Sequence, residues 1–244
     1  MNAPVLSGRG RTVIAVHPIV DALRGGLAGL ADPVAAESMQ KYMKSAMPFR
    51  GVAKPARRQL LRLAVAAHPV SEASALGAVA AELWDGARFR EERYLALSLV
   101  DLPRHARLVD LSWVPVFQHW IVSGAWWDTT DEIASRRIGP LLRAHPADLA
   151  PVLKGWMTDP DRWLRRTSVI CQLGSGPATD LALLGDAIEA NALDSDFFLR
   201  KGIGWALRQQ ARTDPEWVRD FVAAHPRLSP LTRREALKHL GPDS

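Results

Sequence analysis

The chain has 244 residues, of which 48% are hydrophobic, enough to bury one sizeable core or a stack of small ones. Its net charge of +5 and pI near 9.8 favour an anionic partner such as nucleic acid over an acidic small molecule. The single cysteine, Cys171, excludes an internal disulfide and a cysteine zinc cluster, and its apolar neighbours predict a buried, inert thiol. Neither a bilayer-spanning apolar run nor a secretory signal is found, so we expect a cytoplasmic protein.

The pattern along the chain is helical almost throughout. Residues 1–15 contain Gly, Arg, Ser and Pro without periodicity and predict a loose N-terminal arm. Over residues 16–241 apolar residues recur every three or four positions, and no β-branched alternation lasts long enough for a sheet. No low-complexity linker divides this stretch. The sequence therefore predicts an all-α protein with a single domain over residues 16–241.

Two kinds of phrase punctuate the helices. Ala-His-Pro occurs at 67–69, 144–146 and 224–226 and is typical of a helix end. The segments 158–163 and 213–217 each combine a capping side chain, a proline at the helix start and an acid in the first turn. Repeated helix starts predict a superhelical solenoid of antiparallel helical repeats, whose irregular spacing makes the repeats degenerate. The concave face of a solenoid is a natural groove for an extended polymer.

The run Trp126–Asp131 places two tryptophans beside two carboxylates in a basic chain. On a helix Trp127 and Asp131 are four residues apart and share a face, where an indole and a carboxylate would together attract a cation. A lone helical acid is usually solvated or salt-bridged. An acid in a groove suited to a polyanion would repel phosphate, however, and function is one reason to tolerate that repulsion.

Basic residues cluster at several helix positions. Any one cluster is most simply a solvated helix face or part of a salt bridge, but several on successive repeats could contact consecutive DNA phosphates. The clusters are Lys41 with Lys44, Arg57 with Arg58, Arg136 with Arg137, Arg162 with Arg165 and Arg166, Arg200 with Lys201, and Arg233 with Arg234.

Trp205 lies one turn after Lys201 and about one turn before Arg208, on a segment weakened by Gly202 and Gly204. Glycine inside a helix costs up to about 1 kcal/mol relative to alanine, and close approach of another backbone or a ligand is the usual reason to accept it. Core packing is the simpler interpretation of most tryptophans. We assign to the core Trp84, Trp156, Trp163 and Trp217.

Common catalytic constellations are missing from the sequence. There is no glycine-rich phosphate loop and no nucleophile elbow. His68, His145 and His225 suit helix ends, and no two histidines have ligand spacing alongside a carboxylate. We therefore expect neither a metal nor another cofactor.

Five motifs in order resemble the bacterial DNA alkylation repair glycosylases of the AlkD type. The resemblance covers most of the chain beyond the N-terminal arm. The motifs are Tyr42–Lys44 with Met47–Gly51, Trp126–Asp131, Trp163–Thr167, Phe197–Lys201 with Gly204–Arg208, and Leu228–Leu231 with Arg234–Lys238.

The resemblance implies HEAT-like helical repeats and an enzyme that removes cationic alkylated purines, such as 3-methyladenine and 7-methylguanine, from double-stranded DNA without flipping the base. It makes Asp131 the catalytic carboxylate, Trp127 and Trp205 its indole partners, and Arg166 a DNA-contacting residue. It also places Tyr42 near the lesion. With the basic clusters, we predict further DNA contacts from Lys44, Lys201 and Arg208.

The residues make chemical sense of base excision. Alkylation at N3 or N7 makes the purine cationic and a good leaving group, so no general acid is needed. As the glycosidic bond breaks, Asp131 would stabilise the oxocarbenium-like sugar and position or deprotonate the attacking water, while Trp127 and Trp205 hold the cationic nucleotide. Trp126 and Asp128 are then packing and helix support.

Two alternatives stay open from sequence. The first is a non-catalytic helical-repeat module that binds DNA structure or a protein partner, with Asp131 as a surface acid. The second is a protein-binding solenoid without DNA, which the positive charge disfavours. For the enzyme we expect a monomer associated with the nucleoid, because a curved repeat enclosing a duplex needs no second copy.

Overall fold

The computed structural model describes residues 17–241, so the arm predicted at residues 1–15 lies outside the described part. Within residues 17–241 there are fourteen α-helices and no strand, which confirms the predicted all-α class. The chain divides into two compact units, the first ending at Leu102 and the second beginning at Pro103. The single domain and the concave basic groove stay predictions.

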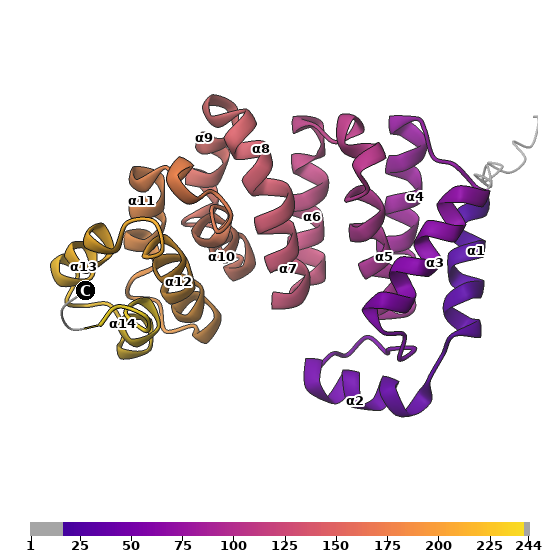
Figure 1. Cartoon of the computed structure of the whole chain (residues 1–244), viewed down its shortest axis with the longest axis horizontal. Coiled ribbons are helices and arrows are strands. Elements are labelled where there is room, and N and C mark those ends of the chain that lie inside the picture. The colour runs from indigo at the N-terminus through magenta and orange to yellow at the C-terminus, as the bar shows by residue number, and fades with distance from the viewer. Residues whose placement is uncertain (1–16, 242–244) are drawn as a thin grey trace, which may run out of the picture. The chain divides into compact units, whose positions relative to one another are not determined.

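The first unit contains five helices. They are α1 (Pro18–Gly29), α2 (Pro33–Met43), α3 (Lys54–Ala67), α4 (Ala73–Asp85) and α5 (Arg90–Val100). Helix α1 packs against α3 and α4, and α5 packs against both α3 and α4, whereas α2 stands apart at a steep angle (Figure 1). The apolar stripe of α1 recurs every three or four residues and is fully buried, which drives this packing.

Ion pairs also connect α1 to α4 and α5 in this unit. The Arg24 guanidinium on α1 donates to Glu82 on α4 and to Glu92 on α5, each at 2.8 Å. Glu91 holds the loop that follows α2. Its fully buried carboxylate accepts hydrogen bonds at 2.9 to 3.1 Å from the backbone N–H groups of residues 50–52. Residues 50–52 lie outside any helix, so these bonds supply the partners that their backbone N–H groups need. They also fix the loop after α2 to α5.

The second unit contains the other nine α-helices. They are α6 (Val114–Gly124), α7 (Trp127–Ile133), α8 (Gly139–Ala144), α9 (Pro146–Trp156), α10 (Arg162–Ile170), α11 (Leu181–Asn191), α12 (Phe197–Gln210), α13 (Pro215–Ala224) and α14 (Pro230–Ala236). Short 3₁₀ turns are η1 (Pro103–Leu108), η2 (Leu111–Trp113) and η4 (Gly176–Ala178). A π-helical turn, η3 (Ala134–Ile138), joins α7 to α8, and its widened backbone follows Asp131 within one turn.

Helix starts in this unit repeat with a regular step. Helices α7, α10, α12 and α14 begin at residues 127, 162, 197 and 230, which are 35, 35 and 33 residues apart. Helices α9, α11 and α13 begin at residues 146, 181 and 215, which are 35 and 34 apart. The predicted irregular spacing is therefore wrong for this unit. The Ala-His-Pro phrases and the two capping segments mark only some of the helix ends and starts, so the distances between them do not show the regular repeat.

Each set of helices forms one layer of the unit. Helix α10 packs against α7 and α12, and α12 packs against α14, while α9 packs against α11 (Figure 1). Apolar side chains fill the space between the layers, including Trp156, Trp163, Ile170 and the fully buried Cys171. The predicted burial of Cys171 is confirmed, and this burial raises the pKa of the thiol to about 12.

The helix punctuation is mostly as predicted. Helices α3, α8 and α13 end at the alanine of each Ala-His-Pro phrase, with the histidine as the C-terminal cap. Helix α13 begins at Pro215 behind the capping Asp214, as expected. The prediction for Pro160 is wrong, because α10 begins two residues later. Asp161 caps that helix by accepting from the N–H groups of Trp163 and Leu164 at 2.7 and 3.2 Å.

Candidate active site

Helix α7 carries both members of the predicted cation site. Trp127 is its first residue and Asp131 its fifth, so the two are one turn apart as the sequence predicts. Trp126 caps the helix, and its ring packs on Trp163 and Phe198 at centroid distances of 6.0 and 5.4 Å. The packing role predicted for Trp126 is confirmed. This aromatic cluster fixes the start of α7 against α10 and α12.

Asp131 forms a two-point ion pair with Arg166 of α10. Nε donates to Oδ1 at 2.7 Å and Nη2 to Oδ2 at 2.9 Å, the parallel geometry that a guanidinium and a carboxylate favour. The third arm of the guanidinium, Nη1, donates to the backbone carbonyl of Phe198 on α12. Arg166 therefore ties together three successive helices of one layer.

The ion pair is largely withdrawn from solvent. The exposed fraction of the side chain is 6% for Arg166 and 17% for Asp131. Burial raises the pKa of the Asp131 carboxyl above its ordinary value, and the hydrogen bonds and charge of Arg166 oppose that rise. A carboxylate has about four acceptor sites, so two bonds to Arg166 leave about two for a water or a cationic substrate.

Room for this guanidinium comes from Gly202. A Cβ at this position would lie 2.9 Å from Nη1 of Arg166. Gly204 lies equally close to α14, where a Cβ would stand 2.6 Å from the Cβ of Glu235 and 3.1 Å from the carbonyl oxygen of Thr232. The close approach predicted for this glycine-containing helix is confirmed. Both glycines admit neighbouring helices rather than bend the backbone.

Trp205 and its two basic neighbours share α12. Trp205 is half-buried, with Lys201 one turn before it and Arg208 about one turn after. Lys201 Nζ donates to Glu235 Oε1 at 2.8 Å, and Arg208 Nη1 donates to Oε2 of the same carboxylate. The hydrogen bond from Lys201, reinforced by that from Arg208 against a weaker effect of burial, lowers the pKa of Glu235 below its ordinary value.

The remaining predicted site residues, Tyr42 and Lys44, lie in the first unit at the end of α2. Tyr42 is 75% exposed, and Lys44 is exposed and caps the helix in the left-handed conformation with φ of 49°. The structure thus pairs Asp131 directly with Arg166 and groups Lys201 with Arg208, while the DNA contacts predicted for all these residues stay predictions.

Several basic residues are engaged within the protein. Arg162 pairs with Asp196 at 2.9 Å and Arg165 with Asp194 at 3.0 Å, in each case from α10 to the segment at the start of α12. The salt-bridge interpretation of the basic clusters holds for these two arginines. Sequence reasoning missed Glu235, although Gly204 signalled that something approaches closely beside Trp205.

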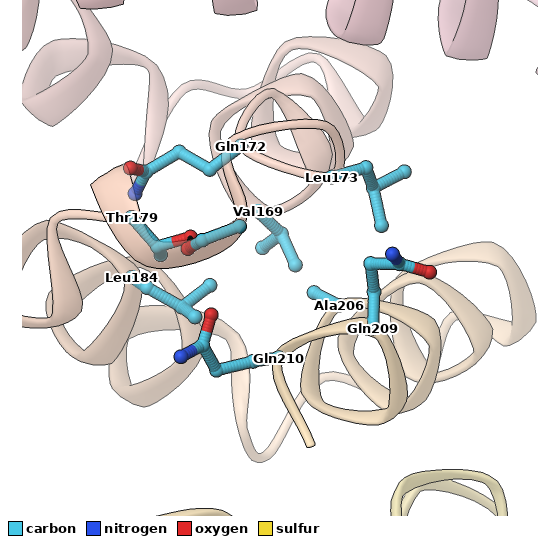
Figure 2. Close-up of a pocket in the computed structure, with 9 residues that line it drawn as sticks. Val169, Gln172, Leu173, Thr179, Leu184, Ala206, Gln209 and Gln210 are labelled. Atoms are coloured by element: carbon cyan, nitrogen blue, oxygen red, sulfur yellow. Dashed lines mark hydrogen bonds between the residues drawn. The ribbon is translucent and has the colours of Figure 1, made fainter. Parts of the chain in front are cut away.

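Two cavities in the second unit are lined by residues other than the predicted site residues. Figure 2 shows the smaller, of about 10 Å³, between α10, α11 and α12 and lined by Gln172, Gln209 and Gln210 among others. It has room for about one water molecule. The larger, of about 300 Å³, lies against α13 and α14. Neither is lined by Trp127, Asp131 or Trp205.

Comparison with known proteins decides the family. Residues 23–240 match the model of a family described as DNA alkylation repair enzyme. The chain belongs to the DNA alkylation repair enzyme family. A solved structure described as a predicted DNA alkylation repair enzyme from Enterococcus faecalis is similar, with a TM-score of 0.78 and 28% identity over 87% of this chain and 97% of that one. No curated protein sequence matches.

Family membership confirms the sequence-based resemblance and supports a role in DNA repair. Among residues 17–241, no helix is both long and apolar enough to cross a membrane. The same residues contain no group of three or more His, Cys, Asp or Glu side chains arranged to hold a metal ion.

Proposed function

We propose that this protein is a DNA glycosylase that hydrolyses the N-glycosidic bond of cationic N3- or N7-alkylated purines, such as 3-methyladenine and 7-methylguanine, in duplex DNA. The observation that carries the proposal is the partly buried Asp131 carboxylate, held at two points by Arg166 and one helical turn from Trp127. A desolvated carboxylate interacts more strongly with a developing cation than a solvated one does.

The proposed reaction needs one carboxylate. The bond between C1′ and the purine nitrogen breaks, and its electron pair neutralises the positive ring of the leaving base. The oxygen of water bonds to C1′, and Asp131 accepts the proton that this water loses. Arg166 keeps the carboxylate ionised and oriented, because protonation of Asp131 would sacrifice a charge-assisted hydrogen bond.

The tryptophans supply the cation-binding surface in this proposal. Trp127 on α7 and Trp205 on α12 would contact the sugar and the cationic nucleotide through their ring faces. Tyr42 and Lys44 on α2, with Lys201, Arg208 and the two remaining N–H donors of Arg166, would contact the DNA around the lesion. No metal or other cofactor is assigned to any step.

We propose that the base stays in the helix during excision. Enzymes that extrude a base normally receive it in a fitted pocket. The contacts proposed for Trp127, Asp131 and Trp205 are with the sugar and the cationic nucleotide, and these contacts require no such pocket. A bulky substituent on the purine nitrogen would then slow release only slightly compared with methyl, whereas a base pocket would exclude it.

The decisive experiment is incubation with methylated duplex DNA and detection of free bases by mass spectrometry. Release of 3-methyladenine or 7-methylguanine above the spontaneous rate supports the proposal. Binding to DNA without release would support the non-catalytic module instead, with the Asp131–Arg166 pair as a structural link between helices. Asp186→Asn is a matched control, because that acid is about half exposed and pairs only at the surface with Lys154 at 3.1 Å.

A further inference from the structure

Glu235 on α14 occupies the space between the two cations that flank Trp205. One carboxylate oxygen accepts from Lys201 and the other from Arg208, so both basic side chains point at the same acid. Lys201 and Arg208 are seven residues apart, which is nearly two turns, and both lie on the face of α12 that carries Trp205. The carboxylate is therefore held on the same face of α12 as Trp205, the tryptophan predicted to bind the substrate.

The position of Glu235 is fixed by the packing of α12 on α14. Gly204 admits the Cβ of Glu235 to a distance that a larger residue would not allow. The Thr232 hydroxyl, which belongs to the same turn of α14, donates to the backbone carbonyl of Arg200 at 3.1 Å. Ser229 caps this helix by accepting from the Thr232 N–H at 3.1 Å. The carboxylate is thus presented to the cations by a rigid support.

The contacts made by Glu235 are those that a phosphate would make. A lysine ammonium and an arginine guanidinium each donate to one of two anionic oxygens, and DNA phosphate offers the same pair of oxygens. The site is also reachable from solvent, since 41% of the Lys201 side chain and 23% of the Arg208 side chain are exposed. A DNA phosphate that used both cations would have to displace Glu235.

We propose that Lys201 and Arg208 form a DNA phosphate site whose internal occupant, Glu235, competes with DNA and limits the affinity for any duplex. This inference rests on the proposed function. Non-specific DNA binding is dominated by phosphate contacts, so an internal carboxylate weakens it without touching the reacting atoms. Its benefit is release: the protein leaves undamaged DNA and product DNA more rapidly than an open pair of cations would permit.

The test is the salt dependence of binding to unmodified and methylated duplexes by the wild type and Glu235→Gln. Glutamine keeps the shape of the side chain and one acceptor but removes its charge. Two freed cations should steepen the slope of log K against log salt by up to about 1.8 and tighten binding roughly tenfold to a hundredfold near 0.1 M salt.

The matched control is Asp186→Asn, which removes one negative charge from the exposed ion pair between Asp186 on α11 and Lys154 on α9 and should leave the slope unchanged. In the triple variant Glu235→Gln, Lys201→Gln, Arg208→Gln, the added slope should disappear. Equal slopes for Glu235→Gln and Asp186→Asn would overturn the inference even if the wild type releases methylated bases. No binding of DNA by the wild type would overturn both the inference and the proposed function.

Single variants test the same idea if Glu235→Gln fails to fold. With Glu235 in place, Lys201→Gln and Arg208→Gln should each change the slope by much less than one unit, because each cation already donates to the Glu235 carboxylate. If the two cations contacted DNA without competition from Glu235, each substitution would reduce the salt slope of DNA binding by about one unit. A loss of about one unit in each variant would therefore overturn the inference.

Discussion

Two carboxylates in the second unit are held by cations from neighbouring helices, yet their surroundings differ. Asp131 on α7 has one partner, Arg166, and burial raises its pKa. Glu235 on α14 has two partners, Lys201 and Arg208, whose hydrogen bonds lower its pKa. A desolvated acid with one partner suits interaction with a developing cation, whereas an acid shared by two solvent-accessible cations regulates affinity for an anion.

The comparison shows how one repeat layer produces different chemistry. Asp131, Arg166 and Lys201 each occupy the fifth position of α7, α10 and α12, helices whose starts are 35 residues apart. Equivalent positions in stacked repeats face the same way, so charged residues there meet their neighbours in the next helix. The two acids then differ in the number of their cationic partners, one for Asp131 and two for Glu235.

The largest expected effect comes from removing the charge of the buried acid. Asp131→Asn should slow release of 7-methylguanine by at least about a hundredfold, the usual contribution of a general base, while binding to methylated duplex stays within a few-fold. Single-turnover release and equilibrium binding measure the two quantities, with Asp186→Asn as control. Equal release rates for Asp131→Asn and the wild type would remove Asp131 from the mechanism.

Removing the partner of Asp131 should change the pH dependence. The carboxylate acts only when ionised, so activity is present above its pKa and is lost as the pH falls through it. Arg166 opposes the rise in that pKa, so Arg166→Gln should move the acid limb of the pH profile to higher pH. The unpaired buried charge should also lower the free energy of unfolding by about 3 kcal/mol, measured by denaturant titration.

The same variant tests the DNA contact that the resemblance implies for Arg166. Loss of one phosphate contact reduces the salt slope of DNA binding by about one unit. An unchanged slope would mean that the arginine acts only through Asp131. An unmoved acid limb would mean that it does not tune the carboxylate.

The packing that presents Glu235 can be tested without changing a charge. Gly204→Ala places a Cβ 2.6 Å from the Cβ of Glu235, and overpacking of this kind costs about 1 to 3 kcal/mol. Gly77→Ala is the control, because a Cβ there meets no atom within 4 Å inside helix α4 and should stabilise the protein by up to about 1 kcal/mol. Thermal unfolding of both variants should therefore shift in opposite directions.

The smallest effect is expected at a surface pair. Asp186→Asn breaks the ion pair with Lys154, whose side chains are 51% and 60% exposed, and should change stability by less than about 1 kcal/mol. Denaturant titration in low and high salt measures the change. A larger loss would undermine its use as a matched control for Asp131 and Glu235.

Much of the fold was predictable because it depends on local sequence. Apolar spacing fixed the all-α class, and the Ala-His-Pro phrases located the ends of α3, α8 and α13. Pro160 misled the prediction of α10, because Asp161 is the better cap and competes for the same helix start. The Ala-His-Pro phrases do not reveal the regular repeat, because they mark helix ends, whereas the period lies in the helix starts. Helices α10 and α12 do begin with related segments, Asp161–Arg166 and Asp196–Lys201.

The sequence by itself determined the helical class, the family and the one-turn spacing of Trp127 and Asp131, because these depend on residue identity and local periodicity. Only the tertiary structure decided which cation meets which acid. Arg166 is 35 residues from Asp131 and Glu235 is 34 from Lys201, so packing of successive helices, not local spacing, creates those pairs. Packing also gives the two carboxylates opposite pKa shifts, because burial dominates at Asp131 whereas the hydrogen bonds from Lys201 and Arg208 dominate at Glu235.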